Sequence, residues 1–146
     1  MPTINLGVDY EDVKNLDDFP VVPGGTYPFT IRVAKDGTTN AGRPKIFWGL
    51  EVIDPASNKP TSIPHNTVLP WMKDGEMDVS GVGMLVQICK AVGLPWTGKS
   101  LDTEAYLGRS GTVTVKIERR NKQDPTGNWV PDPDGKEQNV VDKFIY

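Results

Sequence analysis

The chain has 146 residues, 37% of them hydrophobic, which suffices for one domain with its own core and is too short for the wide parallel sheet of a P-loop ATPase. Its formal net charge is −3, so binding to a polyanion has to rely on a local basic patch. The single cysteine, Cys89, excludes an intramolecular disulfide, and no stretch has the pattern of a signal peptide or a membrane span. We therefore expect a cytoplasmic protein.

The first part of the chain predicts a leader followed by a β-hairpin. Residues 1–22 form an acidic leader, and residues 23–146 are the expected domain. Apolar side chains alternate with polar ones over residues 27–33 and 46–52, which predicts two strands with one buried face each. This alternation places Phe47 on the outer face of the second strand and Trp48 in the core.

The middle of the chain predicts a weak strand and then a helix. The strand is expected within residues 61–71, where Pro64 and Pro70 mark it as an edge strand or one with a bulge. Apolar residues then recur every three or four positions between Ser80, a candidate N-cap, and Gly93, a candidate C-terminal stop. This is the only long helix that the sequence predicts.

The last third predicts two further strands. A short helical turn at residues 103–107 precedes a strand at residues 111–120, in which Val113, Val115 and Ile117 face inward, and residues 139–146 form the final strand. Three strands, a helix and two strands are the element order of the OB-fold, a five-stranded Greek-key barrel with its helix between strands three and four. We therefore expect an all-β domain with one helix and this architecture.

Residues 93–100, GLPWTGKS, match the phosphate-loop pattern G-x-x-x-x-G-K-[ST]. A working phosphate loop follows a buried strand and opens a long helix, so that backbone N–H groups converge on the phosphates. Here a helix precedes the pattern, Gly108 soon stops the segment after it, and Pro95 has no N–H to donate. The sequence favours a connector over a nucleotide site.

Groups suited to catalysis or metal binding are few in this sequence. His65 lies beside prolines, Cys89 lies on an apolar helix face, and the pattern supplies neither with a partner. The acidic stretch at residues 132–137 lacks the further oxygen ligands of a calcium loop. We therefore expect no enzymatic activity, no metal and no cofactor.

Basic and aromatic residues have the mixture that single-stranded nucleic acid requires, cations for phosphates and flat rings for bases. The candidates are Arg32, Lys35, Arg43, Lys45 and Phe47 in the first hairpin, Trp71 and Lys73 at the end of the third strand, and Arg119, Arg120, Lys122 and Trp129 in the last connection. Alternatives stay open for the aromatic residues. Phe47 is compatible with a loop or homodimer contact, Trp129 with a ring folded back onto the barrel, and Trp71 with barrel closure.

Four segments, PGGTYPFTI, IFWGLEVIDP, MLVQICKAVGL and YLGRSGTVTVKIE, resemble a family of phage-encoded OB-fold single-stranded DNA-binding proteins. The resemblance extends over residues 23–146. It implies a non-catalytic, largely sequence-independent protein that binds single-stranded DNA, with RNA as an alternative ligand. It also implies phage replication and recombination in the cytoplasm of an infected bacterium, with phage or host replication proteins as partners.

One feature departs from that family. Many members end in a flexible acidic tail that recruits partners, whereas this chain ends in VVDKFIY, the pattern of a strand, and carries its acidic run near the N-terminus. Tail-mediated recruitment is therefore not expected from the sequence as it stands, and a tail removed from the C-terminus is an alternative. A structural or adaptor role in a phage virion is the second functional hypothesis, because an OB-like barrel does not fix function.

Overall fold

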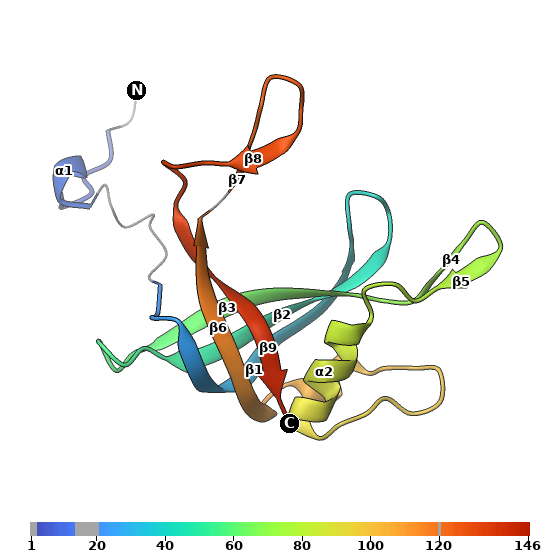
Figure 1. The fold of residues 1–146 in the computed structure, drawn as a ribbon. Coiled ribbons are helices and arrows are strands. Elements are labelled where there is room, and N and C mark those ends of the chain that lie inside the picture. Colours follow the sequence, from blue (N-terminus) through green and yellow to red (C-terminus); the bar gives the residue numbers. More distant parts are fainter. Residues whose placement is uncertain (1–2, 14–20, 120) are drawn as a thin grey trace.

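The computed structural model describes residues 3–13, 21–119 and 121–146 (Figure 1). It is mostly β, with 49% strand and 12% helix. One antiparallel sheet has the strand order β3-β2-β1-β6-β9, with the bounds Pro60–Val68, Pro44–Ile53, Gly25–Thr38, Ser110–Arg119 and Glu137–Ile145. Two short hairpins project from it: β4 (Trp71–Lys73) with β5 (Glu76–Asp78), and β7 (Asn121–Gln123) with β8 (Trp129–Pro131).

The helical elements are short. Helix α2 (Gly83–Val92) lies between β3 and β6 in the chain, η1 (Thr103–Tyr106) is a turn of 3₁₀-helix, and α1 (Tyr10–Val13) is a single turn in the leader. The expected order of three strands, a helix and two strands is confirmed for the long elements. Within the ranges described above, no helix is long and apolar enough to cross a membrane.

The sheet is not closed into a barrel. Its edge strands, β3 and β9, share no backbone pairing in the described structure. They nevertheless approach each other, because the ring centroids of His65 in β3 and Phe144 in β9 lie 5.4 Å apart. The structure therefore confirms a twisted five-stranded antiparallel sheet, which is a coarser statement than the expected OB-fold barrel.

The core lies between one face of the sheet and α2. Trp48 is fully buried, its Nε1 donates to Thr67 Oγ1 at 2.8 Å, and its ring meets that of Tyr106 edge-on with 5.5 Å between centroids. Cys89 is also buried, and burial raises the pKa of its thiol. Both residues are core residues, as the alternation and the helical spacing predict.

A β-bulge changes which side chains of β1 face the core. The register shifts between Ile31 and Val33, which leaves Arg32 as the extra residue. Beyond the bulge Ala34 packs against the core, whereas Val33 lies on the outer face opposite Gly49. A Cβ at Gly49 would lie 3.0 Å from the Val33 Cβ, which explains the glycine. The sequence-based prediction that Val33 faces inward was therefore wrong.

Two boundary predictions and one prediction of burial also need correction. The third strand ends at Val68, so the segment that begins at Trp71 belongs to a separate hairpin. Helix α2 has Val82 as its N-cap and no side-chain cap, because the expected cap, Ser80, bonds elsewhere. Ile117, expected to face inward, is exposed because its end of β6 extends past the core toward β7–β8 (Figure 1).

The C-terminal end of α2 agrees with the sequence. Gly93 adopts a left-handed conformation with φ 69°, and its N–H donates to the Lys90 carbonyl. The phosphate-loop-like residues 93–100 therefore begin where the carbonyl end of a helix lies, and anions are disfavoured there. The segment connects α2 to η1.

The start of the domain is attached to the last strand by a side-chain amide. Asn139 in β9 is buried, its Oδ1 accepts from the Val22 N–H at 2.8 Å, and its Nδ2 donates to the Val22 carbonyl at 2.9 Å. This pair of bonds imitates a backbone ladder. It marks the point where the leader joins the sheet.

Candidate nucleic-acid interface

The outer face of β2 carries an aromatic ring between two polar neighbours. Phe47 is half-buried there, opposite Lys35 of β1 and Asn66 of β3 in the pairing register. Side chains directly opposite each other in an antiparallel sheet have Cβ atoms about 4.5–5.5 Å apart, so both neighbours flank the ring. Lys45 and Gly49 lie two positions away on the same face. We call Lys35, Lys45, Phe47, Gly49 and Asn66 the platform.

The two lysines of the platform are available to a ligand. Lys35 is exposed and Lys45 half-buried, and neither forms an ion pair with another residue in the described ranges. Arg32, also on the outer side of β1, is placed 3.4 Å from Glu51 Oε1. Among the outward residues of β1, β2 and β3, the positive charge without an ion pair in the described structure therefore lies on Lys35 and Lys45, beside the ring.

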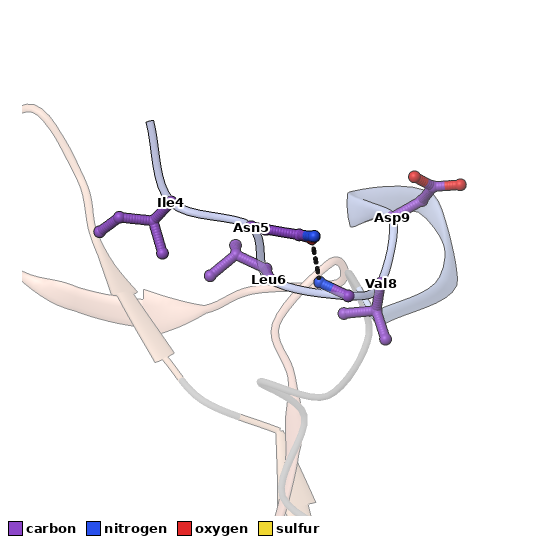
Figure 2. A pocket seen from close by; sticks show the side chains of 6 residues that line it. Ile4, Asn5, Leu6, Val8 and Asp9 are labelled. Atoms are coloured by element: carbon purple, nitrogen blue, oxygen red, sulfur yellow. Dashed lines mark hydrogen bonds between the residues drawn. The ribbon is translucent and has the colours of Figure 1, made fainter. Parts of the chain in front are cut away.

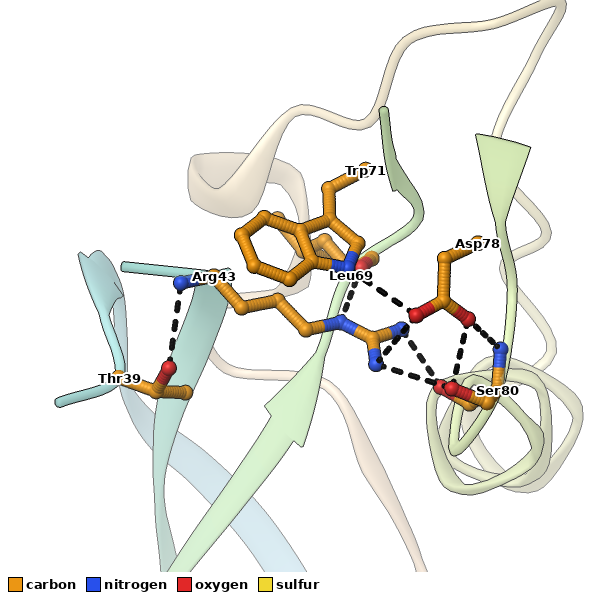
Figure 3. Close-up of polar contacts among 6 residues, drawn as sticks. All are labelled: Thr39, Arg43, Leu69, Trp71, Asp78 and Ser80. Atoms are coloured by element: carbon orange, nitrogen blue, oxygen red, sulfur yellow. Dashed lines mark hydrogen bonds and ion pairs between the residues drawn. The ribbon is translucent and has the colours of Figure 1, made fainter. Parts of the chain in front are cut away.

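Arg43 does not present its charge to this face (Figure 3). Its Nε donates to the Leu69 carbonyl at 3.0 Å, its Nη1 donates to Ser80 Oγ at 3.2 Å, and its Nη2 donates to the Ser80 carbonyl. Nη1 also lies 3.8 Å from Asp78 Oδ2, and the guanidinium carbon lies 5.9 Å from the Trp71 ring centroid. Only 13% of the side chain is exposed. The structure thus gives Arg43 the role of fastening β4–β5 to the sheet.

Asp78 is the second member of this anchor (Figure 3). It accepts hydrogen bonds from the hydroxyl of Ser80 at 2.6 Å, from the backbone N–H of the same residue at 2.9 Å, and from Trp71 Nε1 at 3.2 Å. These bonds, with the Ser80 hydroxyl first, lower the pKa of Asp78 to about 2. Trp71 is therefore half-buried and engaged, while Lys73 is exposed near the acidic Asp74 and Glu76.

The second hairpin, β7–β8 with its turn, presents an exposed indole. We call residues 121–131 the arm. Trp129 has 68% of its surface exposed and stands opposite Gln123. Lys122 pairs with Val130 and therefore points to the other face of the hairpin, where its Nζ lies 3.9 Å from Asp132 Oδ1. Trp129 does not fold back onto the sheet in this structure.

The tip of the arm is a well-bonded turn. Asp124 Oδ1 accepts from the N–H of Thr126 at 2.9 Å, from its hydroxyl at 2.6 Å, and from the N–H of Asn128 at 2.9 Å. The same bonds lower the pKa of Asp124. Trp129 follows this turn directly in the chain.

The base of the arm is held by Arg119. Its Nη1 donates to the Gly135 carbonyl at 3.1 Å, and its Nη2 lies 3.5 Å from Glu137 Oε1. The neighbouring candidate, Arg120, lies outside the described residues. Arg119 therefore stabilises the return of the chain into β9 and offers a partly neutralised charge.

The candidates fall into three places. Lys35, Lys45 and Phe47 meet near the C-terminal end of β1, whereas the arm extends from the end of β6 that pairs with the N-terminal end of β1. Trp71 and Lys73 occupy the β4–β5 hairpin. Sequence reasoning missed Asn66, because the weak third strand gave no register, although its place two residues after Pro64 was visible.

Among the described residues, two hollows lie away from the platform and the arm. One, of about 470 Å³, is lined by Val86, Cys89, Lys90, Gly93, Pro95 and Trp96 on α2 and the segment after it. The other is formed within the leader alone, by residues 4–9, where Asn5 Oδ1 accepts from the Gly7 N–H at 2.9 Å (Figure 2). Neither is lined by a platform or arm residue. In the part of the chain that the structure describes, no three His, Cys, Asp or Glu side chains gather as a metal site.

A family model described as "Protein of unknown function (DUF669)" matches residues 7–129. The chain belongs to the DUF669 family. In this DUF669 protein the matched region contains the whole platform, ends at the first residue of β8 and leaves out β9. No curated protein matches the chain.

Proposed function

We propose that this protein binds single-stranded DNA, without catalysis and without strong sequence preference. The platform carries the proposal: a ring on the open face of a sheet, with Lys35 beside it and Lys45 two positions away. A ring accepts any base by stacking, and ammonium groups contact phosphates of any sequence. Trp129 on the arm supplies a second stacking surface.

The strand order supports an OB-fold as the framework of this site. An OB-fold is a partly open five-stranded Greek-key barrel whose central strands and loops bind oligonucleotides. The order β3-β2-β1-β6-β9, with α2 between β3 and β6, agrees with that topology. The contact between His65 and Phe144 spans the gap that barrel closure would fill.

The biological setting that we propose is phage DNA replication and recombination in the cytoplasm of an infected bacterium. It rests on the resemblance of residues 23–146 to phage single-stranded DNA-binding proteins. Phage or host replication proteins are the partners in this proposal, and RNA is the alternative ligand.

A virion adaptor is the second candidate function, and one observation favours it. Met72, Met77 and Val79 are exposed on and beside the β4–β5 hairpin, which also carries Asp74 and Glu76. An apolar patch with acidic neighbours suits a protein partner better than a polyanion. The adaptor role therefore predicts a stable protein complex and no salt-sensitive DNA binding.

Fluorescence anisotropy of a labelled oligothymidine, titrated at low and moderate salt with a duplex of equal length beside it, tests the proposal. We expect tighter binding to the single strand, and Phe47→Ala or Trp129→Ala to cost about 1–3 kcal/mol of binding free energy each. Met72→Ala is the matched control, because it removes an exposed apolar side chain away from the platform and the arm. Failure to bind at low salt would transfer the assignment to the adaptor.

A further inference from the structure

The outer face around Phe47 differs in charge on its two sides. On the β1 side stands Lys35, which has no ion pair in the described structure, while Arg32 at the bulge lies 3.4 Å from Glu51 Oε1. On the β3 side the outward residues are all uncharged: Ser62, Pro64, Asn66 and Val68. A bound polyanion is therefore attracted toward β1 and gains nothing electrostatic from β3.

Asn66 is the polar group nearest to the ring on the uncharged side. It is exposed, stands directly opposite Phe47 in the register, and forms no hydrogen bond with a described residue. Its amide offers both a donor and an acceptor. A base that lies flat on the ring has its hydrogen-bonding edge at the height of a neighbouring side chain on the same face.

The residues of the next row of the sheet are apolar and closely packed. Gly49 follows Phe47 on the outer face and has no side chain, and its cross-strand neighbours there are Val33 and Pro64. Val33 packs against Gly49, because a Cβ at Gly49 would lie 3.0 Å from the Val33 Cβ, and the polar atom nearest to that position is Ser62 Oγ, at 3.6 Å. Asn66 is therefore the only residue with a polar, uncharged side chain among the six that form these two rows: Lys35, Phe47, Asn66, Val33, Gly49 and Pro64.

We propose that Asn66 reads the edge of the base stacked on Phe47 while Lys35 holds the adjoining phosphate, so that the sugar–phosphate backbone lies over β1 and the bases point toward β3. This inference rests on the proposed function and adds an orientation to it. The protein then binds all single strands but with different affinities for different homopolymers, and Asn66 determines the order of these affinities.

The test measures the affinities of equal-length labelled oligothymidine, oligocytidine and oligoadenine for the full chain and three variants. Asn66→Ala reduces the ratio between the tightest and the weakest homopolymer by about fivefold, the low end of the discrimination of one base contact. Lys35→Ala weakens all three by the same factor and lowers the slope of log K against log salt by about 0.7. Ser62→Ala, on the same face but opposite Glu51, leaves the ranking unchanged.

Each of the other outcomes overturns a defined part of the inference or of the proposed function. Equal affinities of the unmodified chain for all homopolymers, or an unchanged ratio in Asn66→Ala, refute the reading role while the proposed function stands. If Lys35→Ala changed the ranking of the homopolymers without changing the slope of log K against log salt, the bases would lie toward β1, the reverse of the proposed orientation. No binding of the unmodified chain to any oligonucleotide at low salt removes the proposed function itself, and this inference with it.

Discussion

His65 is the only histidine of the chain, and its ring lies against Phe144 where β3 approaches β9. Its Nε2 is buried and has no hydrogen-bond partner among the described residues. Burial without a partner disfavours the charged imidazolium and lowers the pKa of His65 to about 4. The residue therefore acts as a neutral ring that packs the gap between the edge strands.

This environment predicts a pH-dependent free energy of unfolding. The pKa of His65 is lower in the folded chain than the unfolded value of about 6.5, so the unfolded chain binds more protons between these values. The contribution of His65 to the free energy of unfolding is fully present above pH 6.5. It decreases as the pH drops toward 4, by about 2 kcal/mol between pH 7 and pH 5. Denaturant unfolding at both pH values measures the loss.

The comparison variant is His65→Leu, which keeps an apolar side chain at this position and removes the titrating group. Its free energy of unfolding should change less between pH 7 and pH 5 than that of the unmodified chain, by about the same 2 kcal/mol. An equal pH dependence in both proteins would assign the effect to carboxyl groups.

At the scale of elements, the β4–β5 hairpin depends on Arg43. The guanidinium donates to two carbonyls and a hydroxyl and lies near Asp78, with little exposure to solvent. Arg43→Ala leaves these acceptors without their donor, and we expect a loss of about 2–3 kcal/mol in the free energy of unfolding. Urea unfolding, followed by circular dichroism, measures it.

Arg32→Ala is the matched control, because this arginine has an exposed side chain and a single ion pair, to Glu51. Exposed pairs contribute about 0–1 kcal/mol, so its loss should be smaller. The salt dependence of DNA affinity should show the opposite order. Arg32→Ala should lower it, and Arg43→Ala should leave it unchanged. If Arg43→Ala lowered the slope of log K against log salt, Arg43 would have to be counted among the residues that contact phosphates.

For the whole molecule, the net charge of −3 opposes a polyanion and local cations must overcome it. Lys35 and Lys45 have no ion pair in the described structure, whereas Arg32, Arg119 and Lys122 lie near carboxylates. If only the two lysines contact phosphates, log K should fall with log salt with a slope of about −1.4, and release of the three ion pairs steepens it to about −3.5. Oligothymidine titrations at several salt concentrations measure the slope, and a slope near zero would contradict phosphate binding.

Local patterns in the sequence determined much of the sheet. Period-two alternation placed Trp48 inside and Phe47 outside, and three- and four-residue spacing placed Cys89 on the buried face of α2. Gly93 ended that helix as expected, because a left-handed terminal residue is a local requirement. These features depend on residues that are close in the sequence, so the sequence pattern alone predicts them.

Only the tertiary structure decided which side chains meet. The bulge at Arg32 shifts the register of β1. The position of Asn66 opposite Phe47 and the bonds from Arg43 to Ser80 bring together residues that are distant in sequence. Basic and aromatic composition named candidates by residue type but could not separate Lys35, which has no ion pair in the described structure, from the anchored Arg43. The reason is physical: alternation fixes the face of a side chain, whereas strand register and long-range hydrogen bonds determine its partners.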